Sequence, residues 1–255
     1  MLTSLSLILV TALGMQNPQQ PSNAFRPSPA PDTPRVDAPT ITPEMRGDIF
    51  MARKMYREAI EVYKSGAGTS PVLANKTGIA YHQMVELDSA KKYYERAIKL
   101  NPQYAEAINN VGTVYYAQKS YRRAIAQYKR ALRITPDSAS ILSNLGTAYF
   151  ARKNYDLALE SYQQAIALDP DVFEHRNSVG VLLQERSVAE RAKFYYYMAK
   201  TYAKAGANER ALLYIRKALE EGFKEREKFT QDPEFSGLRD DPEFKKILAA
   251  EHKVL

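Results

Sequence analysis

The stretch AEAINNVGTVYYAQKSYRRAIAQYKRALRITPDS, residues 105–138, is followed directly by ASILSNLGTAYFARKNYDLALESYQQAIALDPDV, residues 139–172. In both stretches a glycine at the eighth position precedes an alanine by twelve residues, and a proline closes the unit. Small residues are needed where two helix backbones cross closely, and a fixed period of about 20–50 residues is typical of one supersecondary unit stacked many times. The step of 34 residues extends along the chain through Gly78, Gly112, Gly146 and Gly180, and through Ala90, Ala124, Ala158 and Ala192.

The apolar residues of each unit predict two helices. The first helix of the unit at 105–138 has one apolar face, with spacing i, i+3, i+4, i+7, formed by Ile108, Val111, Gly112 and Tyr115. A second apolar face follows, formed by Ala124, Tyr128 and Ala131. Pro136 ends the unit because proline lacks the backbone N–H that a helix interior requires.

These residues resemble the tetratricopeptide repeat, whose pattern is L-G-x2-Y, then A-x3-F, then A and P, within 34 residues. The family's tryptophan position is substituted in every unit, and tyrosine replaces its usual phenylalanine. The resemblance covers residues 44–222. It implies an all-α, right-handed superhelical solenoid of helix–turn–helix repeats with C-terminal capping helices.

The period slips at two places. The step from Ala59 to Ala90 is 31 residues, so the first unit is about three residues short, near Pro71. Beyond Gly180 the register falls fifteen residues short of 34, because Ala199 follows Gly180 by only 19. We therefore expect the helix near 188–205 to serve two units at once and to interrupt the superhelix.

The chain divides into four predicted parts: a signal peptide at 1–14, a Pro-rich disordered linker at 15–43, the repeat domain at 44–222 and capping helices at 223–255. Eight of the fourteen prolines lie in residues 15–43, a composition that cannot bury a core. Two Asp-Pro-Glu-Phe segments, beginning at Asp232 and Asp241, predict helix starts in the capping region.

The apolar run within residues 1–14 is too short to span a bilayer and ends in small residues, as a cleaved signal does. We expect export to a bacterial periplasm or cell envelope. No Lys or Arg precedes the run, so an uncleaved anchor or a frayed terminus of a cytoplasmic protein is the alternative. Membrane contact is expected only through an uncleaved N-terminal segment. The absence of cysteine excludes a lipoprotein anchor and any disulfide.

The sequence contains no recognisable catalytic, cofactor or metal motif. The histidines, His82, His175 and His252, lack a metal-ligand spacing, and no phosphate loop or nucleophile elbow occurs. We expect neither enzyme activity nor a bound cofactor.

The resemblance implies that the first helices line a concave groove. Carried onto this chain, the predicted lining includes Asn75, Asn109, Asn110, Tyr116, Asn144, Phe150 and Asn177. A side-chain amide offers both a donor and an acceptor to a peptide backbone. The row resembles the asparagine ladder of O-GlcNAc transferase, although asparagine is also common at one of these positions in the family consensus. The carboxylate clamp of heat-shock cochaperones is not expected, because the position that needs asparagine holds Ile79, Thr113, Thr147 and Val181.

The helix near 188–205 can also be aligned with the first helices of the repeats. In that alignment its predicted open face is formed by Lys193, Tyr196, Tyr197, Lys200 and Lys204. Lysines beside aromatic rings suit an acidic or C-terminal ligand segment. Four apolar residues in a row, 194–197, cannot all face one core, so at least one should be exposed. The alternative is that the tyrosines pack beneath the terminal cap with their hydroxyls in water.

The leading interpretation is a non-enzymatic scaffold that binds an extended peptide or a helix of a partner protein in the groove. The alternative is an anionic-surface binder, for lipid or nucleic acid, that uses the basic outer helix 120–134. That helix carries five cations and no acid, within a chain of net charge +7. A merely solvated face explains the same charges, and no specific nucleic acid is expected.

Overall fold

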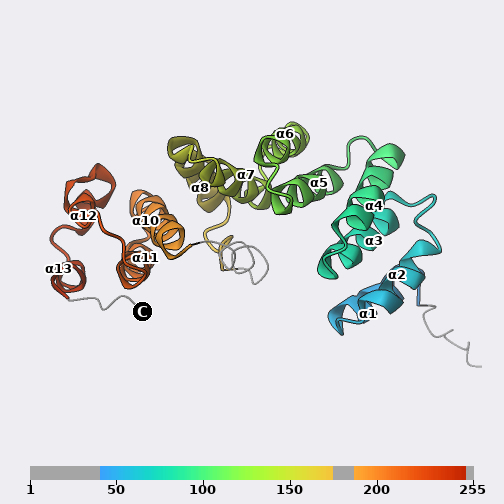
Figure 1. Ribbon diagram of the computed structural model, residues 1–255, viewed down its shortest axis with the longest axis horizontal. Helices are drawn as coiled ribbons and strands as arrows, with labels where there is room; N and C mark the ends of the chain where they lie inside the picture. The colour runs from blue at the N-terminus through green and yellow to red at the C-terminus, as the bar shows by residue number, and fades with distance from the viewer. Residues whose placement is uncertain (1–40, 175–186, 251–255) are drawn as a thin grey trace, which may run out of the picture. The chain divides into compact units, whose positions relative to one another are not determined.

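The computed structural model describes residues 41–174 and 187–250, which contain helices and turns but no strand (Figure 1). In chain order the elements are α1 (Pro43–Ala52), α2 (Tyr56–Lys64), α3 (Pro71–Gln83), α4 (Leu87–Leu100), α5 (Ala105–Ala117), α6 (Tyr121–Leu132), α7 (Ala139–Ala151), α8 (Tyr155–Leu168), α10 (Val188–Lys204), α11 (Asn208–Glu220), α12 (Lys228–Gln231), the 3₁₀ helix η1 (Pro233–Leu238) and α13 (Pro242–Ala249).

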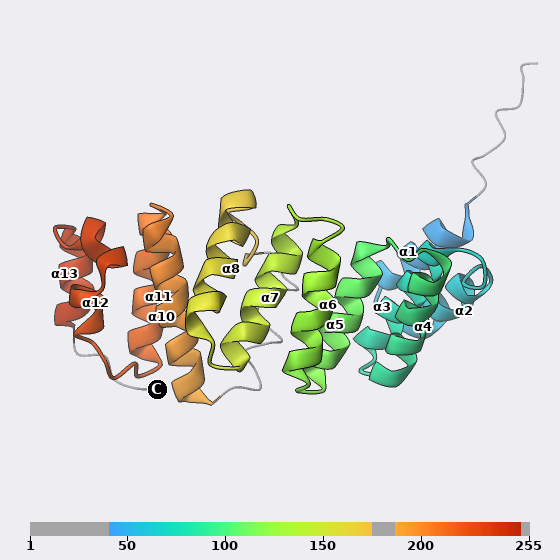
Figure 2. The same ribbon diagram turned by 90° about the horizontal axis from the view of Figure 1, so that it is seen from above.

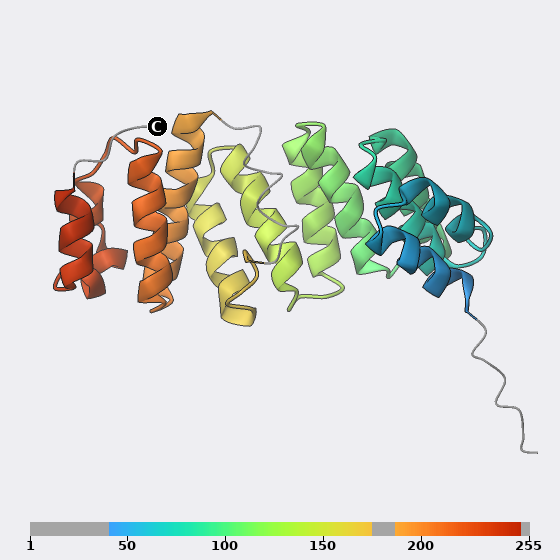
Figure 3. The same cartoon turned by 90° about the horizontal axis from the view of Figure 1, so that it is seen from below.

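The helices pack in consecutive pairs. The pairs are α1 with α2, α3 with α4, α5 with α6, α7 with α8 and α10 with α11. The second helix of each pair also packs against the first helix of the next described pair, so the pairs follow one another in chain order (Figures 2 and 3). This is the all-α solenoid of helix–turn–helix units that the sequence predicts.

Each regular glycine of the described residues faces a tyrosine of its own pair. A Cβ atom on Gly146 would lie 2.6 Å from the ring of Tyr162, and the same holds at 2.5 Å for Gly112 against Tyr128. These tyrosines are buried. The two backbones approach closely only because the first helix lacks a side chain there, which explains why a glycine and a tyrosine recur sixteen residues apart.

The short first unit has a local cause. Helix α2 ends at Lys64, and α3 begins only at Pro71, where the side chain of Ser70 accepts a hydrogen bond from the backbone N–H of Leu73. Proline at the first helical position completes this start. The second helix of this unit, α2, has nine residues where α4 has fourteen, which accounts for the short unit predicted near Pro71.

Helix α10 packs on α8, as a first helix packs on the second helix of the preceding pair. Its Phe194 ring lies 5.5 Å from Phe150 of α7 and 6.1 Å from Tyr162 of α8, measured between centroids. It also pairs with α11, where Ala199 replaces the glycine of the other units. Ala192, which the 34-residue step assigns to a second helix, lies in this same helix, α10. That the helix serves two units at once stays a prediction. Gly180 lies outside the described residues.

The C-terminal elements close the last pair. Helix α13 packs on α11, and η1 packs on α10. Asp241 caps α13 by accepting from the backbone N–H groups of Glu243 and Phe244. Asp232 begins η1 without a side-chain capping bond, because its carboxylate is held by α10 instead. One of the two matching segments thus forms an α-helix and the other a 3₁₀ helix.

Candidate functional site

The asparagines of α3, α5 and α7 form one line of hydrogen bonds, here called the asparagine relay. Asn144 donates to the side-chain oxygen of Asn109 at 3.0 Å, and Asn109 donates to Asn110 at 3.4 Å. Asn110 donates to Asn75 at 3.0 Å, and Asn75 donates to a carboxylate oxygen of Glu106 at 2.9 Å. Every amide in the line donates in the same direction, toward the carboxylate.

The members of the relay differ in exposure. Asn75 and Asn109 are buried, at 1% and 8% exposure, and bond to neighbouring helices. Asn110 and Asn144 are partly exposed. An amide nitrogen carries two hydrogens, so each of these two retains one N–H beyond the relay. The sequence places all four on one face, but only Asn110 and Asn144 present groups to solvent.

Charged groups lie next to the relay on α1 and α3. The ammonium of Lys76 lies 2.7 Å from Asp48 and 2.8 Å from Glu44, and the hydroxyl of Tyr63 donates to Asp48 at 2.6 Å. Burial of Asp48 acts to raise its pKa, but the hydrogen bonds from Lys76 and Tyr63 outweigh this and lower the pKa. These contacts fix α1 on α3.

Two predicted aromatic residues have different surroundings. Phe150 is buried at 4% exposure, among Tyr155, Phe194 and Tyr197, so it belongs to the core between α7 and α10 rather than to an open lining. Tyr116 is partly exposed, with its ring 5.2 Å from Tyr121. Asn177 lies outside the described residues.

The predicted lysine–tyrosine face is largely covered by the chain's own C-terminal segment. Tyr196 is buried at 3% exposure, its ring stacks on Phe223 at 4.5 Å, and its hydroxyl donates to Asp232. Lys200 pairs with Asp232 at 3.0 Å and with Glu234 at 3.2 Å. These two residues therefore do not form an open ligand face, whereas Lys204 remains exposed.

The row of apolar residues at 194–197 also differs from expectation. Phe194 and Tyr196 are buried, while Tyr195 and Tyr197 are partly buried, so none of the four is exposed. Tyr197 stacks on Tyr155 at 4.9 Å. The helix is covered on several sides, by α8, α11 and η1, which is why adjacent apolar residues all find contacts.

The sequence interpretation missed Glu106, which ends the relay. A signal was present: Asn75 and Asn110 lie 35 residues apart, as do Asn109 and Asn144, one more than the repeat. Successive first helices therefore bring the fifth position of one unit beside the sixth position of the next. A carboxylate on the same face was the natural acceptor for the last amide.

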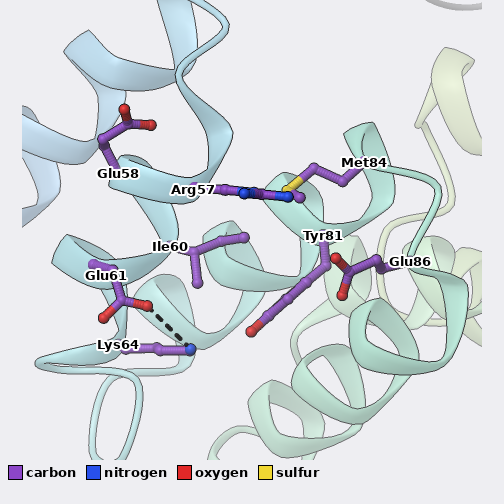
Figure 4. A pocket seen from close by; sticks show the side chains of 8 residues that line it. All are labelled: Arg57, Glu58, Ile60, Glu61, Lys64, Tyr81, Met84 and Glu86. Atoms are coloured by element: carbon purple, nitrogen blue, oxygen red, sulfur yellow. Dashed lines mark hydrogen bonds and ion pairs between the residues drawn. The ribbon is translucent and has the colours of Figure 1, made fainter.

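A cavity of about 600 Å³ lies elsewhere, between α2 and the end of α3 (Figure 4). Figure 4 shows Tyr81 with its hydroxyl toward Lys64, and the ion pair of Lys64 with Glu61 at 3.3 Å. None of the predicted site residues lines it, and its charges are mixed. The cavity walls are Arg57, Glu58, Ile60, Glu61, Lys64, Tyr81, Met84 and Glu86.

The described residues contain no group of three or more histidine, aspartate or glutamate side chains arranged to hold a metal ion. In the same part of the chain, no helix has the length and apolar character that crossing a membrane requires.

We expect His82 to make the stability of the fold dependent on pH. Its Nδ1 atom lies 3.4 Å from the hydroxyl oxygen of Tyr94, and burial lowers its pKa. Between the folded and unfolded pKa values the unfolded chain binds more protons, so we expect the free energy of unfolding to fall as the pH drops below about 6.5. Urea unfolding of the wild type at about pH 7.5 and pH 5 measures this fall, and His82→Gln should reduce it. An equal fall in the variant would contradict the assignment to His82.

Family models match three segments of the chain. The model described as "TPR repeat" matches residues 112–151, and two models described as "Tetratricopeptide repeat" match residues 139–172 and 76–104. With the helix pairs described above, these matches show that the chain contains tetratricopeptide repeats. Proteins of this family generally serve as protein-interaction scaffolds rather than as enzymes.

Several solved structures are similar. MamA matches with 21% identity and a TM-score of 0.48, over 69% of this chain and 93% of that one. MamA residues 41 to the end, from Desulfovibrio magneticus RS-1, match with 19% identity and a TM-score of 0.49, over 70% and 92%. The second repeat domain of human RPAP3, solved with an HSP70 peptide, matches with 24% identity and a TM-score of 0.41, over 42% and 92%. No curated protein sequence matches significantly.

Proposed function

We propose that the face of α5 and α7 carrying Asn110 and Asn144 binds an extended segment of a partner protein through its backbone. The observation that carries the proposal is the asparagine relay, in which each of these residues donates one amide N–H and keeps a second that no described residue accepts. Because the amides are already fixed by their neighbours, they lose little freedom when they bind a ligand.

The relay also determines what such a segment would meet. Asn144 stands at the open end, and none of the hydrogen bonds of the described residues engages its side-chain oxygen. It therefore offers both an acceptor and a donor, which matches the N–H and C=O of a peptide unit. Binding to main-chain groups selects an extended conformation rather than a particular side chain.

The test needs a ligand that the protein itself selects. Peptides chosen from a displayed random library on the full chain supply the probe, with affinity measured by fluorescence anisotropy. Asn110→Ala with Asn144→Ala should weaken binding about thirtyfold, from two net hydrogen bonds of about 1 kcal/mol each. Gln127→Ala with Gln164→Ala, which removes two amides from second helices, should leave the affinity unchanged.

Asn110 also supports Asn75 and Asn109, so its loss can affect stability as well as binding. Asn144→Ala alone disturbs one relay bond only and serves as the second variant. Circular dichroism should show unchanged helix content in both variants. If the selected peptides bind the Asn144→Ala protein as tightly as the wild type, the proposed site is wrong.

A further inference from the structure

The outer side of α6 carries basic side chains that form no ion pair with the described residues. Residues 119–134 include six Lys or Arg residues and no acid, and none of the ion pairs of the described residues involves them. Arg122, Lys129 and Arg133 are exposed on the side opposite to the buried stripe of Ala124 and Tyr128. Successive turns of the helix therefore point positive charge away from the core.

Basic side chains also lie on the corresponding side of α4. Lys92, Arg96 and Lys99 are exposed there, again opposite to the buried stripe, and α4 and α6 both pack on α5. The exposed Glu95 is engaged by Lys91 at 3.6 Å. The basic second-helix surface is defined as Lys92, Arg96, Lys99, Arg122, Arg123, Lys129 and Arg133.

Tyrosine rings support these cations where carboxylates would normally do so. Arg123 lies 5.8 Å from the ring centre of Tyr115, and Lys129 lies 5.7 Å from that of Tyr149. A ring face attracts a cation without neutralising it. The positive charge thus remains available, and its self-repulsion would be relieved by an external anion.

The neighbouring second helices on either side, α8 and α2, lack this excess of positive charge. Helix α8, the next second helix, carries the exposed acids Asp156 and Glu160 and no Lys or Arg. Helix α2, on the other side, has equal numbers of Lys or Arg and Glu residues. The positive charge is therefore confined to α4 and α6 rather than spread over all second helices.

The surface lacks the side chains that other partners would need. The exposed large apolar residues of the described chain include no aromatic, so bases cannot stack on it. Leu100, at the end of α4, is the one exposed large apolar residue on α4 and α6. A protein partner would therefore lack the buried apolar anchors that dominate protein–protein interfaces. Binding must therefore depend on charge alone.

The cations also extend in two dimensions. From Arg122 to Arg133 the surface runs about 16 Å along α6, and α4 adds a second row, since a helix rises about 1.5 Å per residue. A phosphodiester backbone is linear and would contact one row of these cations at a time. A layer of lipid headgroups is two-dimensional and can contact both rows at once. We propose that the basic second-helix surface binds the anionic phospholipid headgroups of a bilayer.

The experiment uses the full chain and vesicles of phosphatidylcholine with or without about 30% phosphatidylglycerol, measured by co-sedimentation. The wild type should bind only the anionic vesicles, and binding should weaken steeply between about 50 and 200 mM salt. Arg122→Glu, Lys129→Glu and Arg133→Glu together should reduce the affinity at least about 100-fold, since each basic side chain near such a surface contributes roughly a fivefold factor.

A matched control separates position from net charge. Arg53→Glu, Arg152→Glu and Lys224→Glu change the net charge equally at exposed sites outside this surface and should leave most of the affinity intact. Thermal melting verifies that both triple variants are folded. An equal loss in the control, binding to neutral vesicles, or no binding to anionic vesicles overturns the proposal. Duplex DNA that displaces the vesicles at the same phosphate concentration overturns it in favour of nucleic acid.

Discussion

Gly146→Ala is expected to lower the free energy of unfolding by about 2–3 kcal/mol, despite the better helix propensity of alanine. The new Cβ atom would lie 2.6 Å from the ring of Tyr162 and 3.2 Å from the backbone oxygen of Ala158. Tyr162 is fully buried and cannot turn away. The clash can therefore be removed only if α7 and α8 move apart, which weakens the packing between them.

Chemical denaturation of the wild type and the variant measures this effect. Gly237→Ala is the control, because a Cβ atom there would meet nothing within 4 Å, and its stability should stay within about 0.5 kcal/mol of the wild type. A double-mutant cycle with Tyr162→Ala should show strong coupling, since alanine lacks the ring atoms that the new Cβ atom would meet. Wild-type stability of Gly146→Ala would show that the helix pair tolerates a wider spacing.

Phe229→Ala is expected to cost about 3–5 kcal/mol and to act mainly on the C-terminal end. Phe229 is fully buried, with its ring centre 5.5 Å from that of Tyr196 and 5.4 Å from that of Phe235. Its loss opens a cavity beneath the cap of α10. Because the stability of a repeat array depends on contacts between neighbours, the last pair should open before the rest.

Hydrogen exchange followed by mass spectrometry distinguishes a local from a global loss. Protection should fall in α10 and α11 of Phe229→Ala and persist in α5 and α6. Leu213→Ala, at a residue of α11 that is 39% exposed, should change little. A uniform loss of protection along the chain would show that the solenoid unfolds as one cooperative unit.

Much of the fold could be predicted because the repeat encodes its own packing. A glycine and a tyrosine sixteen residues apart, as in Gly112 and Tyr128, are enough to specify how one helix pair closes. The place of α10 could not be predicted in the same way. The 34-residue step continues to Gly180, whereas the helix that packs on α8 carries Ala199 in the glycine's place.

The candidate site was predictable in its residue types and not in its contacts. The register places Asn75, Asn110 and Asn144 on one face, but which amides bond to one another depends on the spacing of adjacent helices. Tyr196 and Lys200 are covered because they contact Asp232, which is distant in sequence. Their burial could therefore not be predicted from the sequence of α10 alone. Export, the boundaries of residues 1–14 and 15–43, and the role of Asn177 stay predictions.

The relay also has a direction, and Glu106 sets it. An ionised carboxylate can only accept, so it requires Asn75 to turn its nitrogen toward it and its oxygen toward Asn110. The same constraint passes through Asn109, and at the far end the oxygen of Asn144 accepts no hydrogen bond from the described residues. A single negative charge on α5 thus gives a row of otherwise symmetric amides a polarity, by which the surface could distinguish the two directions in which a peptide chain can lie across it.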